Sequence, residues 1–401
     1  MASTSEGARG APAVHGTCDA RFAAVREAFI ENFTARGDCG AALCISIDGR
    51  PVVDLWGGWA DAAHTRPWTP ETIVCVASTT KGLASVCAHR LIERGALDPD
   101  APVARYWPQF AQAGKEGVLV RHLLSHRAGV PAIRADLPAD TLYDWDAFCA
   151  ALAREAPWWV PGTRHGYHAT TFGFLIGELV RRIDGRSIGR LAAEEICGPL
   201  GADFHIGVPE YADARAAEVL PEPAPGPEER SVFTIANADP YGLPGRVFLN
   251  PPRAPQAMNT RRWRAAEIPA SNGHASARGV ARLYSALALG GAVDGIRILG
   301  TDAIEAAILE QSFGEDAVLG VPTRYGMGFM LRLPQPGVGI LPLVPNPRVF
   351  GHTGRGGSIG FADREARVAF GYVMNQFIGE SDKTRDRRWG SLARAFYAAL
   401  G

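Results

Sequence analysis

Residues 75–84 read CVASTTKGLA, and this stretch decides how the rest of the chain is interpreted. Ser78 is followed three positions later by Lys81, and residues three apart on a helix share a face. A lysine amine beside a serine hydroxyl can take its proton and so make the oxygen a nucleophile. Because the chain has three lysines and fifteen serines, chance alone predicts about 0.1 such pairs.

The residues around this pair predict a strand that leads into a helix. Residues 72–76 form a short apolar run typical of a buried strand, and residues 82–94 have apolar side chains at helical spacing. At the start of that helix, the partial positive charge of the helix end and burial both lower the pKa of a lysine. The alternative is a capping Ser or Thr followed by a solvated lysine, and this segment alone leaves both interpretations open.

The composition is that of a globular protein with a small-molecule substrate. At 401 residues and 47% hydrophobic content, the chain can form one large domain with an insertion, or two domains. Its formal net charge is −1, from 41 basic and 42 acidic residues, and no block of like charges occurs. This balance favours an uncharged or mixed-charge substrate and gives no indication of a nucleic acid or membrane partner.

The first ten residues contain no basic start followed by an apolar run, and no stretch reaches the length of a membrane span. We therefore expect a cytoplasmic protein. The cysteines are scattered and include no CxxC motif, which favours reduced thiols over a disulfide framework. They are Cys18, Cys39, Cys44, Cys75, Cys87, Cys149 and Cys197.

The two ends of the chain predict strands covered by helices. Residues 21–35 have the pattern of an amphipathic helix, and the hairpin dipeptide Asp48-Gly49 separates two strand-like segments. These segments are residues 41–47 and 51–56. Near the C-terminus, residues 360–361 and 368–375 resemble paired strands, and residues 389–400 a closing helix.

The middle of the chain predicts a helical lobe inserted between these ends. Helical spacing occurs at residues 118–126, 145–155, 171–183, 188–196 and, after a gap, 277–289. Proline-rich loops at 221–227 and 250–255 could line or cover a cleft. We expect an α/β (α+β) fold in which residues 1–84 and 270–401 form a mainly antiparallel α/β domain. Residues 85–269 would form a mainly helical domain.

Two further segments could complete a site around Ser78. Residues 158–169 read WWVPGTRHGYHA and place Tyr167 in a polar turn before a helix. A phenol there can relay protons if a lysine stabilises its phenolate, although a lone tyrosine in this position more often only packs. Residues 349–358 read VFGHTGRGGS, a glycine-rich strand edge whose amides can hold an oxyanion.

Taken together, these segments resemble a known family. Ser-x-x-Lys, a tyrosine after a Trp-x-Pro-Gly turn and a C-terminal His-Thr-Gly are similar to the three motifs of the serine β-lactamase and penicillin-binding superfamily. The chain looks most like the class C β-lactamase-like esterases called family VIII carboxylesterases. The stretch HLLSHRAGVP at 122–131 also resembles a helix and turn of that group. The resemblance spans roughly residues 20 to 400 and implies a β-lactamase-like fold.

The resemblance implies a role for each matching residue. Ser78 would be the acylated nucleophile, and Lys81 would accept its proton. Tyr167 would pass that proton to the leaving alkoxide and later activate water. The oxyanion hole would be the backbone amides of Ser78 and Arg355, with Gly354 beside them. No metal or cofactor is implied.

Two positions depart from the lactamase pattern. His352 stands where lactamases carry the lysine of Lys-Thr-Gly, and Ala169 stands where they carry the asparagine of Tyr-x-Asn. Both changes remove groups that a lactamase uses around the lactam amide and carboxylate. They therefore favour an esterase over a lactamase.

Two other patterns are weaker candidates. Residues 356–360 read GGSIG, which matches the GxSxG nucleophile elbow around Ser358, but a strand is predicted after it and the elbow requires a helix. His122 and His126, four apart on a predicted helix, could both face a metal. No glutamate lies between them and no third ligand is apparent, so we expect ordinary hydrogen-bonded histidines.

We therefore expect a serine hydrolase that cleaves small carboxylic esters through an acyl-enzyme. An acyltransferase, an amidase or a β-lactamase on the same fold is the nearest alternative in chemistry. A catalytically silent binding protein on that fold is the alternative of a different class. The sequence does not specify the physiological ester, the preferred acyl length or the oligomeric state.

Overall fold

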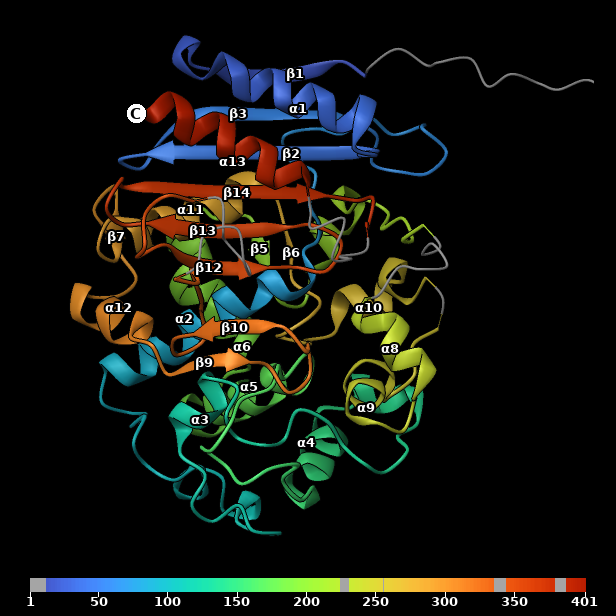
Figure 1. Cartoon of the computed structure of the whole chain (residues 1–401), viewed down its shortest axis with the longest axis vertical. Helices are drawn as coiled ribbons and strands as arrows, with labels where there is room; N and C mark the ends of the chain where they lie inside the picture. Colours follow the sequence, from blue (N-terminus) through green and yellow to red (C-terminus); the bar gives the residue numbers. More distant parts are fainter. Residues whose placement is uncertain (1–11, 224–230, 255, 335–343, 379–386) are drawn as a thin grey trace, which may run out of the picture.

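The computed structural model describes residues 12–223, 231–254, 256–334, 344–378 and 387–401. Its centre is a nine-stranded sheet in the order β1-β3-β2-β14-β13-β12-β11-β10-β9, with every neighbouring pair antiparallel (Figure 1). The strands are β1 (Val14–Cys18), β2 (Gly40–Ile47), β3 (Arg50–Gly58), β9 (Ser312–Glu315), β10 (Pro322–Tyr325), β11 (Met330–Leu331), β12 (Phe350–Thr353), β13 (Ile359–Asp363) and β14 (Val368–Met374). Strands from both chain ends thus form one antiparallel sheet, as predicted.

The hairpin between β2 and β3 follows from its turn residues. Asp48 and Gly49 have φ values of 53° and 77°, and two successive positive φ angles are the requirement of the tight turns that match strand twist. The second predicted pair, β13 and β14, is also an antiparallel hairpin, and β14 then pairs with β2. This last pairing joins the N-terminal and C-terminal parts of the chain.

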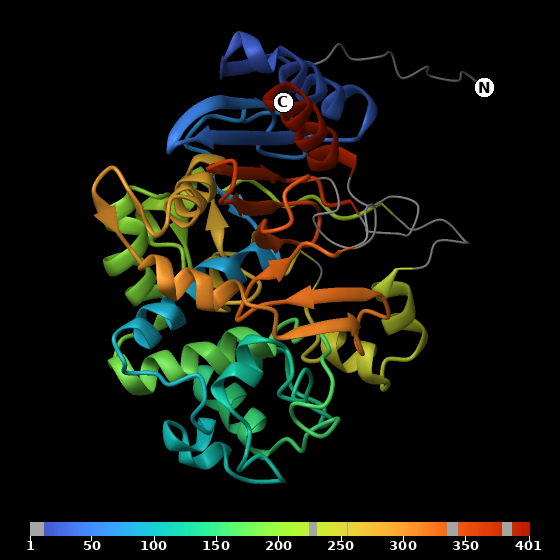
Figure 2. The ribbon, with the colours of Figure 1, turned by 60° about the vertical axis from the view of Figure 1, so that its left-hand side comes forward.

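Helices cover both faces of the sheet. Helices α1 (Ala23–Ala35) and α13 (Arg387–Leu400) pack together on one face, where the blue and red ends of the chain lie side by side in Figures 1 and 2. Helix α11 (Ala277–Ala288) packs against β2, β13 and β14 on the other face. All three helices were predicted from apolar spacing, which buries one stripe of each helix against the strands.

The predicted helical segments in the middle of the chain are present as well. They are α2 (Thr80–Glu93), α3 (Val120–Leu124), α4 (Trp145–Arg154), α5 (Thr171–Asp184) and α6 (Ile188–Ala192), the last continuing through a π-helical turn (Ala193–Cys197) into α7 (Gly198–Leu200). Helices α3 and α6 are shorter than predicted. The boundaries proposed for the two domains, 84/85 and 269/270, stay a prediction.

The stretch that showed weak patterning contains three short helices. These are α8 (Val232–Ala238), α9 (Leu243–Leu249) and α10 (Arg261–Ala265), which lie together at one side of the molecule in Figure 1. Side-chain caps define the starts of α8 and α10, and α9 has a proline in its first turn instead. Ser231 and Thr234 form a reciprocal capping box at α8, and Thr260 caps α10.

The remaining elements are short. A three-stranded sheet contains β4 (Val74–Cys75), β5 (Phe204–His205) and β6 (His274–Ala275), so the strand predicted at 72–76 is reduced to two paired residues. The others are α12 (Thr301–Ile308), the pair β7 (Ala292–Val293) and β8 (Ile296–Arg297), and the 3₁₀ turns η1 (Ala20–Phe22), η2 (Ala77–Thr79), η3 (Val103–Arg105), η4 (Pro108–Phe110), η5 (Ala139–Tyr143), η7 (Glu210–Arg215) and η8 (Ala257–Asn259).

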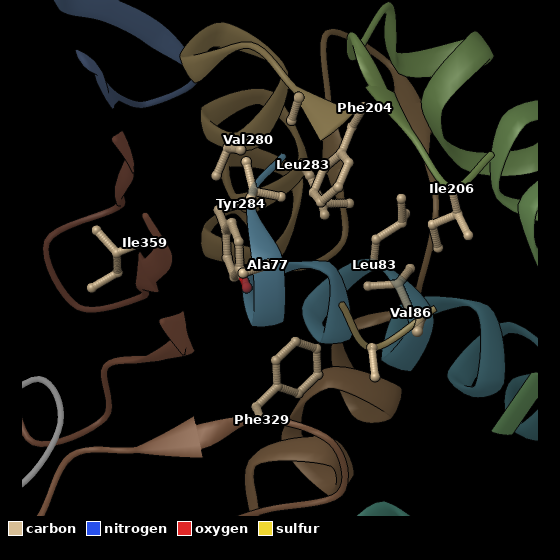
Figure 3. Packing of buried hydrophobic residues seen from close by; sticks show 14 of the residues in the cluster. Ala77, Leu83, Val86, Phe204, Ile206, Val280, Leu283, Tyr284, Phe329 and Ile359 are labelled. Atoms are coloured by element: carbon tan, nitrogen blue, oxygen red, sulfur yellow. The ribbon is translucent and has the colours of Figure 1, made fainter. Parts of the chain in front are cut away.

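Helix α2 lies inside the hydrophobic core. Figure 3 shows Leu83 and Val86 of α2 in one buried cluster with side chains of α11 and with Phe204, Ile206 and Phe329. The packing is tight at Gly82, where an added Cβ would lie 2.3 Å from the Tyr284 hydroxyl of α11. The core therefore fixes the position of α2 against the sheet.

No helix among the described residues is long and apolar enough to cross a membrane. All seven cysteines are free thiols, and five of them are buried.

Candidate active site

Ser78 lies in the 3₁₀ turn η2, directly before α2, as predicted. It is the one residue between 72 and 89 that is not buried, so solvent reaches part of it. The turn is held by Thr80, which donates a 2.5 Å hydrogen bond to the Ala77 carbonyl and accepts one of 2.8 Å from the Gly273 amide. Ala77 has a φ of 44°, in the left-handed region that non-glycine residues rarely adopt. The surrounding structure thus holds the serine in a constrained turn.

Lys81 is fully buried one turn further along α2. Its Nζ lies 3.2 Å from Ser78 Oγ and donates hydrogen bonds to the carbonyls of Ala169 (2.8 Å) and Ala270 (3.0 Å). Burial, and to a smaller extent the positive charge of Arg253, hold the pKa of Lys81 well below its usual value. A neutral amine has two N–H groups and one lone pair. In that form the two carbonyls would take both N–H groups and leave the lone pair for the Ser78 hydroxyl.

Tyr167 is buried beside this pair, in the turn that precedes α5. Lys81 Nζ lies 4.6 Å from the centre of its ring. The Tyr167 backbone amide donates a 2.9 Å hydrogen bond to Asp316 Oδ1, and this bond holds the turn in place. The structure therefore brings together the three residues predicted to act on the substrate.

Asp316 is a residue that the sequence did not single out. It is fully buried, and its Oδ1 accepts hydrogen bonds from the amides of Tyr167, Val318 and Leu319, each 2.9 Å long. The Thr323 hydroxyl, itself 2.9 Å from His165 Nε2, donates to Oδ2. A lone aspartate between Glu315 and Ala317 carries no motif, so only the fold reveals that it supports Tyr167.

The glycine-rich strand edge lies against the other side of η2. Thr79 Oγ1 donates a 3.4 Å hydrogen bond to the His352 carbonyl and lies 3.1 Å from Ser358 Oγ. Ser358 Oγ in turn donates a 2.7 Å hydrogen bond to the Val76 carbonyl. These bonds join the end of β12 to the turn that carries Ser78.

Gly354 occupies the closest point of this contact. A Cβ on Gly354 would lie 2.2 Å from the Val76 carbonyl oxygen and 2.2 Å from Ser358 Oγ. Only a glycine therefore allows β12 to approach η2 this closely. The use of the Ser78 and Arg355 amides for an oxyanion stays a prediction.

Ser358 is buried and bonded into the same contact, and the strand β13 follows it directly. A nucleophile elbow requires a strand, a sharp turn and a helix with the serine exposed. Ser358 therefore does not fit a nucleophile elbow, as its strand context predicted, and its hydroxyl instead joins the two segments.

His352 is a neutral group in the position of the lactamase lysine. Its side chain is 1% exposed, and its Nδ1 lies 2.7 Å from the Thr353 carbonyl, so Nδ1 carries the proton. Nε2 is then an acceptor without a partner among the described residues, and the ring centre is 6.1 Å from that of Tyr167. Burial, with the nearby Lys81, lowers the pKa of His352 to about 3. The histidine therefore supplies no positive charge at neutral pH.

The second departure, Ala169, contributes its main chain and not its side chain. Its carbonyl accepts a hydrogen bond from Lys81, while a methyl group stands where a lactamase would present an amide. The site thus keeps the backbone contact to the lysine and has no side-chain donor at this position.

His122 and His126 each have a hydrogen bond to the main chain. His122 Nδ1 accepts from the Leu119 amide at 3.3 Å, and His126 Nδ1 accepts from the His168 amide at 3.1 Å. His126 also packs against the rings of Tyr167 and Tyr325. No group of three or more metal-ligating side chains occurs in the described part of the chain.

A cavity of about 710 Å³ lies beside the site. Residues 221–223 of the first proline-rich loop and residues 252–254 of the second line it, as predicted, while residues 224–227 and 255 lie outside the described residues. Ser78, Lys81 and Tyr167 do not line this cavity. It reaches the site through Arg355, next to Gly354, and through Arg253, which donates a 2.8 Å hydrogen bond to Thr170 Oγ1.

Comparison with known proteins agrees with this geometry. The beta-lactamase family matches residues 27–394. Esterase/beta-lactamase LipL of Mycobacterium tuberculosis (strain ATCC 25618 / H37Rv) is 37% identical over 372 residues, which cover 91% of this chain and 83% of LipL. The crystal structure of a family VIII carboxylesterase is 41% identical, with a TM-score of 0.86, and the match covers 96% of this chain and 100% of that chain. A penicillin-binding protein homolog from Caulobacter crescentus is 39% identical, with a TM-score of 0.85 and the same coverage.

These matches extend over nearly the whole chain and include both the antiparallel sheet and the segments that carry the three motifs. They confirm the family and the fold that those motifs predicted. The chain belongs to the beta-lactamase family.

Proposed function

We propose that this protein is a serine hydrolase that cleaves carboxylic esters through an acyl-enzyme on Ser78. The observation that carries the proposal is the buried Lys81 amine, whose Nζ lies 3.2 Å from Ser78 Oγ and donates hydrogen bonds to the carbonyls of Ala169 and Ala270. A base near a serine is effective when it is neutral at working pH, and burial shifts the pKa of Lys81 in that direction.

The reaction begins when Ser78 Oγ attacks the ester carbonyl and Lys81 takes the hydroxyl proton. The carbonyl oxygen becomes an oxyanion, which the amides of Ser78 and Arg355 stabilise; one such donor is worth about 3 kcal/mol in related chemistry. Tyr167 passes a proton to the leaving alkoxide, so the alcohol departs and the acyl group stays on Ser78. Water, activated by the same two bases, then releases the acid.

Relatives support ester cleavage. LipL is described as an esterase/beta-lactamase, and the solved structure with 41% identity is a family VIII carboxylesterase. The neutral His352 and the methyl side chain of Ala169 favour esters over lactams, because the charge and the amide that would orient a lactam are missing. A missing hydrogen-bond partner costs about 1 to 3 kcal/mol. We therefore expect a preference of roughly a hundredfold, or about 2.7 kcal/mol, for aryl esters over lactams.

The test uses 4-nitrophenyl butyrate and nitrocefin as matched chromogenic substrates. We expect a burst of nitrophenol, and a fluorophosphonate adduct that mass spectrometry locates on Ser78. Ser78→Ala should remove turnover by several orders of magnitude, whereas Ser358→Ala should keep most of it. An adduct on Ser358, or no nitrophenol release from any ester, would contradict the proposal. If nitrocefin were cleaved as efficiently as 4-nitrophenyl butyrate, the proposed selectivity would be refuted but the acyl-enzyme mechanism would not. New esters formed with added alcohols would reveal acyl transfer.

A further inference from the structure

The cavity beside the site combines an apolar wall with two arginines. Phe233, Phe248 and Phe377 form part of the apolar wall. Arg253 and Arg355, which are far apart in the sequence, also line the cavity. An apolar pocket with a few charged groups is the usual form of a small-molecule site. The charged groups in such a pocket determine which ligands it accepts.

The two arginines differ in how their charges are compensated. Arg355 Nε donates a 2.8 Å hydrogen bond to Glu222 Oε1, and its guanidinium lies 3.8 Å from the centre of the Phe233 ring. Arg253 has no carboxylate within 4 Å among the residues that the structure describes. The charge of Arg355 is therefore already paired, and that of Arg253 is available.

The contacts of Arg253 fix its position without neutralising it. Its Nη2 donates to Thr170 Oγ1 at 2.8 Å, and the guanidinium lies 5.7 Å from the centre of the Trp263 ring. Its Nε is buried with no acceptor in the described part of the chain. A hydroxyl and an aromatic ring hold the group in place, but neither carries the negative charge that a partly buried guanidinium normally has beside it.

Arg253 is also close to the reacting groups. Thr170, its hydrogen-bond partner, follows Ala169, whose carbonyl accepts from Lys81. Burial, and to a smaller extent the charge of Arg355, lower the pKa of Arg253 to about 10, and Arg253 in turn lowers the pKa of Lys81. The guanidinium thus lies where the far end of an ester bound at Ser78 could reach the cavity.

We propose that Arg253 binds a carboxylate of the substrate, so that the natural substrates are esters that also carry a carboxylate group. This inference rests on the proposed function and names its substrate class. A guanidinium binds carboxylates strongly because its N–H groups match the two oxygens. The apolar wall accommodates the hydrocarbon part between the ester and the acid, as in a hemiester of a dicarboxylic acid.

The test compares substrates that differ only in charge. Mono-(4-nitrophenyl) glutarate and 4-nitrophenyl pentanoate place a carboxylate or a methyl group at the end of an acyl chain of equal length. The pair 3-carboxyphenyl acetate and phenyl acetate places the charge on the alcohol side instead. We expect kcat/KM to favour the anionic member of one pair by at least about tenfold, with a preference that weakens as salt increases. The pair that responds identifies the side of the ester that faces Arg253.

Variants then test whether Arg253 causes the preference. Arg253→Gln should reduce the ratio of anionic to neutral turnover to about one, and Arg253→Lys should keep part of it. Arg367→Gln is the matched control, because Arg367 is 54% exposed and pairs with Asp48 far from the site, so the ratio should not change. Equal turnover within both pairs by the wild type, or an unchanged ratio in Arg253→Gln, overturns the proposal.

A binding measurement separates this inference from the proposed function. In the Ser78→Ala variant, monomethyl glutarate should raise the melting temperature more than dimethyl glutarate does, and adding Arg253→Gln should remove the difference. This result does not require turnover. If the wild type hydrolyses no ester but the anion still stabilises the variant, the proposed function fails and the carboxylate site stands. If neutral esters turn over and the anion gives no stabilisation, the carboxylate site fails alone.

Discussion

Replacing Gly354 by alanine tests the assembly of the site at its closest contact. The new Cβ would lie 2.2 Å from the Val76 carbonyl oxygen, 2.2 Å from Ser358 Oγ and 3.0 Å from Thr79 Oγ1. An ordinary carbon–oxygen contact is about 3.4 Å or more, so the end of β12 must move away from η2 by about 1 Å. The Ser358 hydroxyl can rotate away, but the Val76 carbonyl belongs to the main chain that leads into Ser78.

Two quantities follow from that displacement. Overpacking a buried contact costs about 1 to 3 kcal/mol of unfolding free energy. A shift of about 1 Å between the amides of Arg355 and Ser78 should lower ester turnover about a hundredfold, because misplacement on that scale has this effect on oriented groups. Removing the Ser358 hydroxyl in the same chain should restore little, since the clash with Val76 remains.

The assays are urea unfolding and hydrolysis of 4-nitrophenyl butyrate. Gly117→Ala is the matched control, because a Cβ at the exposed Gly117 would have no neighbour within 4 Å. This control should retain full turnover and wild-type stability or slightly more. Turnover in Gly354→Ala within a few-fold of the wild type, at unchanged stability, would refute the reasoning. So would full rescue of Gly354→Ala by Ser358→Ala.

Two further predictions concern the bases Lys81 and Tyr167 and the buried histidine His274. Lys81→Ala and Tyr167→Phe should each reduce ester turnover almost as much as loss of Ser78, with the double variant little worse than either single one, because groups that act as a unit are not additive; near-normal kcat in Tyr167→Phe would show that another group moves the proton. Burial lowers the pKa of His274 to about 4, so between pH 6.5 and 4 the unfolded state binds a proton that the folded state does not, and stability falls as the pH falls. The free energy of unfolding, measured with urea, should fall between pH 7 and pH 4 by about 3 kcal/mol less in His274→Gln than in the wild type. An equal fall in both proteins would contradict this assignment.

The sequence predicted the features that local patterns encode. Ser78 and Lys81 lie three positions apart, so helical geometry alone brings them together, and Asp48-Gly49 specifies its hairpin without help from the rest of the chain. The position of Tyr167 near Lys81 was predicted only from resemblance, since 86 positions separate them in the chain, from residue 81 to residue 167. The order of the three motifs along the chain predicted this contact, which local sequence patterns alone do not predict.

Other features depend on long-range contacts that carry no sequence signal. Asp316 supports the Tyr167 turn across 149 positions, and Arg253 meets Thr170 across 83. Helices α8 and α9 were missed because each has seven residues, too few for apolar periodicity to appear, and because prolines flank them. Predicting such features requires the fold itself.

The place of β14 in the middle of the sheet has a consequence for synthesis of the chain. β2 pairs on one side with β3, and its other side pairs with residues 368–374, which leave the ribosome more than 300 residues later. Until then an almost entirely buried strand, GAALCISI, has an open edge of unpaired amides and carbonyls. Nascent chains stopped before β14 should therefore recruit chaperones or aggregate through this edge, and translation speed over the last third of the message should affect the yield of folded protein.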